Sequence, residues 1–180
     1  LGEGAWKELG NLTSVSQGTV TRVSGSFGLT AEGRYVIYAV AVDRAGNKSP
    51  YVSSDGIVID TTAPTVTLTP PVEGALSDTG ATVGLQMDEA GTVTYVVSDT
   101  ERTDMTPETL LGAGDRRSLS VPEPQAGQEQ ELRLTGLRAN TAYYVYAVGM
   151  DRAGNVGTVA SVSFITEKTA IAGTVTITGE

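Results

Sequence analysis

The chain has 180 residues, of which 39% are hydrophobic and 18% charged, and its formal net charge is −9. This acidic balance disfavours a nucleic-acid partner, because a negative surface repels the phosphate backbone. The chain contains no Cys and no His, which excludes disulfides, thiolate metal sites and a Ser-His-Asp triad. No apolar run reaches the roughly 18 residues of a membrane-spanning helix, so we expect no membrane insertion.

The first 60 residues alternate between β-branched or aromatic segments and segments rich in Gly, Ser and Asn. This pattern predicts short strands, which we place at 5–9, 18–24, 34–42 and 56–60. Four strands are too few for a complete β-sandwich, so we expect residues 1–60 to be a partial module without its opening strands. Residues 61–64 are expected to form a linker, because Pro64 lacks an amide donor and holds Ala63 in an extended conformation.

Residues 65–166 contain seven segments with strand-like composition, separated by turn residues. They lie at 65–69, 81–87, 91–98, 116–121, 130–135, 142–150 and 160–166. Seven short strands in about 100 residues are typical of an immunoglobulin-like sandwich. The sequence therefore predicts an all-β chain of two tandem β-sandwiches, the first of them incomplete.

One helical turn is predicted between these strands, at residues 106–112. Thr106 is a suitable N-cap, Pro107 suits the first helical position and Gly112 suits the end. We expect Leu110 and Leu111 to pack against the sandwich. After the last strand, residues 167–180 read as a linker followed by the first strand of another module. That strand, 172–178, is a candidate for self-association by strand addition to a neighbouring molecule.

The chain carries one segment twice: residues 35–47 and 143–155 are identical at nine of thirteen positions. Each copy ends in Asp-Arg-Ala-Gly-Asn. Gly tolerates a positive φ, and Asp accepts hydrogen bonds from amides two or three residues further on. We therefore interpret these residues as structural turns: Asp43, Gly46 and Asn47 in the first copy, and Asp151, Gly154 and Asn155 in the second. The alternative is a calcium site that uses Asp43 with Asn47, or Asp151 with Asn155.

The segment from Leu137 to Tyr143, LRANTAY, resembles the tyrosine corner of fibronectin type III domains. In that corner the Tyr hydroxyl bonds to nearby backbone. The resemblance implies that Tyr143 belongs to the core, and the repeat extends this role to Tyr35. The chain departs from the family at Ala139, where Pro is usual.

The resemblance covers nearly the whole chain. The segments DTTAPTVT, AGTVTYVV and TPETLLGAG are similar to the fibronectin-III-like repeats of large bacterial surface proteins. The first unit resembles bacterial Ig-like modules through residues such as Trp6, Gly33, Tyr35, Asp43, Ile57, Ile59 and Asp60. The resemblance implies an extracellular, secreted or wall-attached protein in which these modules act as a non-catalytic spacer with neighbouring modules as partners. No catalytic residue and no cofactor are expected, calcium being the one alternative.

A second function is left open by the outward face of the strand at 142–150. Tyr144, Tyr146, Val148 and Met150 share this face, and Tyr and Met are enriched at interfaces. The face is either an interaction surface for glycan or host protein, or it is covered by the loop at 104–114. Trp6 is open to a similar pair of interpretations, as a core residue or a sugar-stacking aromatic.

Acidic residues gather at Asp88 and Glu89, and again at Asp99, Glu101 and Asp104. We interpret them as solvated loop charges. The alternatives are a calcium cage or a pair of catalytic carboxylates, which glycoside hydrolysis places about 5 to 10 Å apart.

Overall fold

The computed structural model describes residues 28–170. The chain divides into two compact units, Leu1–Ile59 and Asp60–Glu180. Predictions for the strands at 5–9 and 18–24, for Trp6 and for the strand at 172–178 lie outside the described residues. Between residues 28 and 170, no helix has the length and apolar character needed to cross a membrane.

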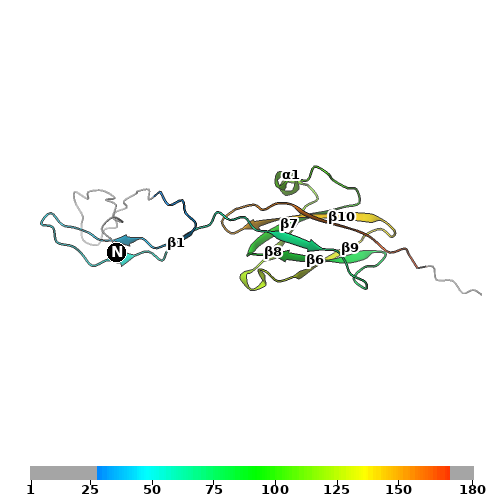
Figure 1. Cartoon of the computed structure of the whole chain (residues 1–180), viewed down its shortest axis with the longest axis horizontal. Coiled ribbons are helices and arrows are strands. Elements are labelled where there is room, and N and C mark those ends of the chain that lie inside the picture. Colours follow the sequence, from blue (N-terminus) through cyan, green and yellow to red (C-terminus); the bar gives the residue numbers. More distant parts are fainter. Residues whose placement is uncertain (1–27, 171–180) are drawn as a thin grey trace, which may run out of the picture. The chain divides into compact units, whose positions relative to one another are not determined.

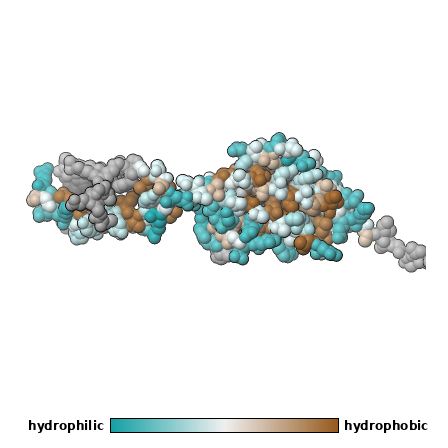
Figure 2. All heavy atoms as spheres, in the orientation of Figure 1, coloured by the Kyte–Doolittle hydropathy of each residue, from teal (hydrophilic) through white to brown (hydrophobic). Residues whose placement is uncertain are grey.

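Unit 1 contains four short strands within its described part: β1 (Gly33–Tyr35), β2 (Tyr38–Ala39), β3 (Val52–Ser53) and β4 (Ile57–Ile59). β1 pairs with β4 and β2 pairs with β3, both antiparallel. Several large apolar side chains of this unit are exposed, among them Tyr51 at 62% and Val58 at 68%. Figure 2 shows hydrophobic residues on the displayed surface of this unit.

The single strand predicted at 34–42 is wrong. The structure has two short strands there, which pair with different partners. The interruption falls at Ile37, whose amide donates to the Ser54 Oγ at 3.0 Å while its carbonyl accepts from the Ser54 amide. A side chain thus replaces one regular ladder bond, and the strand is irregular at that point.

Unit 2 is a seven-stranded β-sandwich, as predicted. Its strands are β5 (Val66–Thr69), β6 (Gly80–Met87), β7 (Gly91–Ser98), β8 (Arg117–Val121), β9 (Gln130–Thr135), β10 (Ala142–Asp151) and β11 (Ala160–Ile165). One sheet has the order β5-β6-β9 and the other β11-β10-β7-β8. In Figure 1, β7 and β10 of the four-stranded sheet lie above β6 and β9 of the three-stranded sheet. A short 3-10 turn, η2 (Glu123–Gln125), follows β8.

Alternating side chains of both sheets build the core of unit 2. In β6, Ala81, Val83, Leu85 and Met87 are buried on one face. β7 and β10 pair over eight positions, with Tyr95 opposite Ala147. The pairing of a large side chain with a small one lets the inner face pack against β6 and β9.

The helical turn α1 (Pro107–Gly112) covers the outer face of the four-stranded sheet (Figure 1). Its N-cap is Thr106, and Thr109 completes a capping box with it. Leu110 is fully buried with Val96 and Val148, whereas Leu111 is only partly buried. The helix therefore forms where the local capping residues predict it, and one leucine attaches it to the sheet.

We expect Leu110→Ala to lower the free energy of unfolding of unit 2 by about 2–5 kcal/mol, because it leaves a cavity beneath the helix. Leu111→Ala, the matched control, is expected to cost less because that side chain is partly solvated. Denaturant unfolding followed by circular dichroism measures both. Equal losses would contradict the different burial of the two side chains.

Candidate functional site

The turn at 151–155 is closed by one carboxylate. Asp151 accepts hydrogen bonds through Oδ1 from the amides of Gly154 and Asn155, at 2.7 and 2.8 Å. Its Oδ2 accepts from the Asn155 side-chain amide at 2.7 Å. Gly154 has φ +94°, a conformation that costs glycine nothing. The side chain thus fixes the reversal between β10 and the segment that follows it.

The first copy is also closed by a carboxylate, although one of its two backbone donors differs. Asp43 Oδ1 accepts from the amides of Ala45 and Asn47, and Oδ2 accepts from the Asn47 side chain at 2.8 Å. Gly46 has φ +87°. Among residues 28–170, no further acidic side chains lie near enough to Asp43 to form a group of three.

These hydrogen bonds lower the pKa of both aspartates. For Asp43, the Asn47 side chain has the largest effect, followed by backbone amides of the turn. For Asp151, burial acts to raise the pKa, but the hydrogen bonds from Asn155, Gly154 and Ala153 outweigh it and hold the pKa below its usual value. Because hydrogen bonds to the charged form favour ionisation, both turns are built around a carboxylate anion.

The second copy differs from the first in its surroundings. Asp60, Glu89 and Asp151 each present a carboxylate oxygen, and these oxygens lie within 4.8 Å of one another. The sequence pattern pairs Asp151 with Asn155 alone and places Glu89 in a different group of acidic residues, so it does not predict this cluster. Three clustered carboxylates either repel one another or share a cation, for which calcium would need six to eight oxygen ligands.

The same turn also holds the beginning of unit 2. The Asn155 side chain donates to the Asp60 carbonyl at 3.1 Å. Next along the chain, Pro64 is fully buried, although residues 61–64 are predicted to form a linker. Thr65 donates to Asp88 Oδ1 at 2.8 Å and accepts from the Asp88 amide. No local sequence signal predicts these contacts, because the partners are 23 to 95 residues apart.

The expectation of an interaction surface at Tyr146 is wrong. Tyr146 is 6% exposed and lies with Val148 beneath the segment around α1, which is the alternative given above. Its hydroxyl accepts a hydrogen bond from the Arg102 amide at 2.7 Å. Apolar side chains on an outer sheet face need cover, and residues 99–114 provide it. Tyr144 is partly buried there, while Met150 is 38% exposed.

The two tyrosines expected in the core differ. Tyr143 is buried, its ring stacks on Phe164, and its hydroxyl accepts from the Arg138 amide at 2.9 Å. This is the geometry of a tyrosine corner despite Ala139. Tyr35 is only half-buried among the described residues, and its hydroxyl donates to the Ala31 carbonyl at 2.8 Å.

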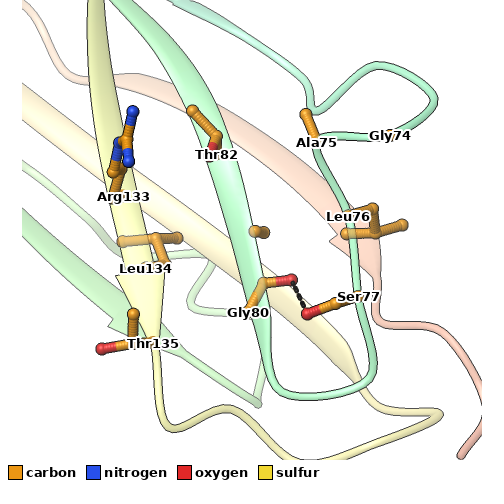
Figure 3. Close-up of a pocket in the computed structure, with 10 residues that line it drawn as sticks. Gly74, Ala75, Leu76, Ser77, Gly80, Thr82, Arg133, Leu134 and Thr135 are labelled. Carbon is orange, nitrogen blue, oxygen red and sulfur yellow. Dashed lines mark hydrogen bonds between the residues drawn. The ribbon is translucent and has the colours of Figure 1, made fainter.

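A shallow depression of about 250 Å³ lies beside β6 and β9 (Figure 3). It is lined by residues 74–77, 80–82 and 133–135. Arg133 is the only charged residue among these described lining residues, and its guanidinium pairs with Glu131 at 2.6 Å. The depression therefore offers neither a carboxylate nor an aromatic platform to a ligand.

No family model matches the chain, and no curated protein matches it. Among solved structures, a computationally redesigned β-sandwich protein is 20% identical, with a TM-score of 0.36, over 62% of this chain and 100% of that one. The chicken CNTN1 FN1-FN3 domains are 18% identical, with a TM-score of 0.39, over 82% of this chain and 45% of that one. Similarity this low says nothing about function, which we infer from the chain's own geometry.

The lowered pKa of Asp151 predicts a pH-dependent contribution to stability. A carboxylate whose pKa is lowered by folding stabilises the protein when the pH is above its unfolded pKa of about 3.9. This contribution is lost as the pH falls through the lower pKa of the folded state. We therefore expect Asp151→Asn to destabilise unit 2 at pH 7 and the difference from the native chain to shrink below pH 4. Denaturant unfolding at several pH values tests this, with exposed Glu73→Gln as control. A difference that stays constant down to pH 2.5 would contradict it.

Repulsion within the acidic group gives a separate prediction. In EDTA at low salt, Asp60→Asn is expected to raise the melting temperature by roughly 4 °C, the effect of about 1 kcal/mol in a domain of this size. The gain should shrink at high salt. A lower melting temperature in EDTA would be inconsistent with repulsion. Repeating the scan with added calcium shows whether the native group responds to the cation.

Proposed function

We propose that the chain is a non-catalytic spacer: modules of a bacterial surface or secreted protein that present an adhesive or catalytic head. The observation that carries this proposal is the path of the chain through unit 2. Thr65 pairs with Asp88, which directly follows the end of β6, whereas the Glu167 amide donates to Ser77, which precedes the start of β6. The two ends of the unit are thus separated by the length of β6.

The separation follows from strand geometry. β6 has eight residues, and a strand rises by about 3.3 Å per residue. The chain therefore enters and leaves unit 2 about 26 Å apart, at opposite ends of the sandwich. A module with this arrangement lengthens the polypeptide by the distance between its two ends, which is what a spacer requires.

The proposed setting is supported by the resemblance of the sequence to repeats of bacterial surface proteins. The acidic composition and the lack of Cys agree with an exported bacterial protein that does not depend on disulfides. We accordingly propose an extracellular location, secreted or attached to the cell wall, with neighbouring modules of the same polypeptide as partners.

A binding module for glycan or protein is the second candidate function, favoured by the exposed aromatic residues of unit 1. Tyr38 is 45% exposed and Tyr51 62% exposed. Exposed tyrosines are common at recognition surfaces because they combine a large apolar area with a polar tip. These two residues take the place of Tyr146, which is buried.

Binding and distance measurements on the purified chain distinguish the two functions. A spacer is expected to show no selective, saturable binding on glycan arrays or in pull-downs. Because the chain lacks Cys, Ala63→Cys with Lys168→Cys permits specific labelling, and fluorescence transfer should report one narrow distance distribution across unit 2. Selective binding that Tyr38→Ser or Tyr51→Ser abolishes would contradict the spacer and favour the binding module. A broad distance distribution would also contradict the spacer.

A further inference from the structure

We propose that residues 60–66 form a lock that keeps the N-terminal strand of unit 2 in place when the chain is under tension. This inference rests on the proposed spacer function for its biological use, since a spacer transmits force between its two ends. The lock itself is a property of unit 2 and can be measured without reference to that use.

The strand order places the two terminal strands along the direction of the force. β5 begins opposite Met87, the last residue of β6, and β11 ends opposite Ala142, the first residue of β10. Tension applied at Asp60 and Glu167 therefore pulls each terminal strand along its own axis. The ladder bonds of such a strand are strained together, whereas a strand peeled sideways breaks them one at a time.

The N-terminal strand has the shorter ladder. β5 pairs with β6 at four positions, whereas β11 pairs with β10 at six. Additional contacts therefore matter more at the N-terminal end, and they come immediately before β5. Thr65 and Asp88 exchange two hydrogen bonds, one of them to a carboxylate, at 2.8 and 3.2 Å.

Pro64 and Asp60 extend the lock beyond the ladder. Pro64 is fully buried, and a Cβ added at Gly157 would collide with its carbonyl oxygen. A Cβ at Gly149 would also press on the Pro64 ring, at 3.2 Å. The absence of a side chain at Gly149 and Gly157 thus leaves room for Pro64 to pack against the sandwich. Four residues before Pro64, the Asp60 carbonyl accepts a hydrogen bond from the Asn155 side chain.

Hydrogen bonds also hold the C-terminal end of unit 2. Thr166 is 2% exposed, and its hydroxyl donates to the Arg138 carbonyl at 2.6 Å and accepts from the Thr141 amide at 3.0 Å. The Glu167 carbonyl accepts from Asn140, and its amide donates to Ser77. With six ladder positions and these hydrogen bonds, β11 is held to the sandwich by more contacts than the four ladder positions of β5 provide. We infer that the 60–66 lock sets the lifetime of unit 2 under force.

The test holds the full 180-residue chain by tags at its two ends and records its lifetime at constant force. Unfolding of the roughly 100 residues of unit 2 lengthens the chain by about 300–330 Å, the extended length less the folded end-to-end distance of about 26 Å, which distinguishes it from the smaller unit 1. Asp88→Ala removes the acceptor of the Thr65 amide, and we expect it to shorten the lifetime of unit 2 about tenfold. Asp88→Asn keeps an acceptor oxygen and should shorten it less.

Tyr146→Phe is the matched control. It also removes an acceptor from a backbone amide, that of Arg102, but this bond fastens the segment between β7 and β8, which are not terminal strands. We expect Tyr146→Phe to leave the lifetime under force within twofold of native. The proposal would be overturned if Asp88→Ala stayed within twofold of native, or if Tyr146→Phe shortened the lifetime as much as Asp88→Ala did.

Two further measurements keep the test decisive. If circular dichroism shows that Asp88→Ala does not fold, Asn155→Ala takes its place, and a lifetime unchanged from native would then overturn the proposal. Failure of the lock is also separable from failure of the spacer function. Selective ligand binding would contradict the spacer function without affecting the lifetime measured under force. An unchanged lifetime would contradict the lock without affecting the distance measured across unit 2.

Discussion

The pairing of β7 with β10 is the constraint on which the rest of unit 2 depends. These strands are aligned over eight positions and are apolar on both faces. The inner face is covered by β6 and β9, which carry the alternating pattern of strands with one solvated face. The outer face requires a second cover, which the segment around α1 supplies. The helical turn and the buried Tyr146 are therefore consequences of a central strand pair that is hydrophobic on both sides.

The repeated pentapeptide shows how one local structure acquires different roles in different surroundings. In both copies an aspartate closes the turn by accepting from the backbone amide and the side chain of the asparagine four residues further on. Only the second copy is described in contact with a distant segment, through Asn155 and the Asp60 carbonyl. That contact, together with buried Pro64, makes residues 60–66 part of the sandwich. A segment that reads as a linker is consequently a structural part of unit 2.

The described surface of unit 2 carries ion pairs and one shallow depression. Its described ion pairs, such as Arg102 with Asp115, lie at the surface, where each contributes little to stability. The depression beside β6 contains neither an aromatic nor an acidic lining residue among the described positions. Among the described residues, the exposed large aromatic side chains, Tyr38 and Tyr51, belong to unit 1, and the proposed alternative of a binding module rests on them.

The sequence by itself determined the elements whose signals are local. Strand-like composition between turn residues located β6, β7 and β9 within one residue, and the Thr106–Pro107 cap located α1, because such patterns depend on neighbours a few residues away. The tertiary structure alone decided that Tyr146 is buried, that residues 34–42 divide between two partners, and that Asp60, Glu89 and Asp151 meet. Each of these depends on residues brought together from distant parts of the chain, and alternation identifies two faces of a strand without saying what covers them. The fold class was therefore readable in the sequence, whereas the N-terminal lock required the folded chain.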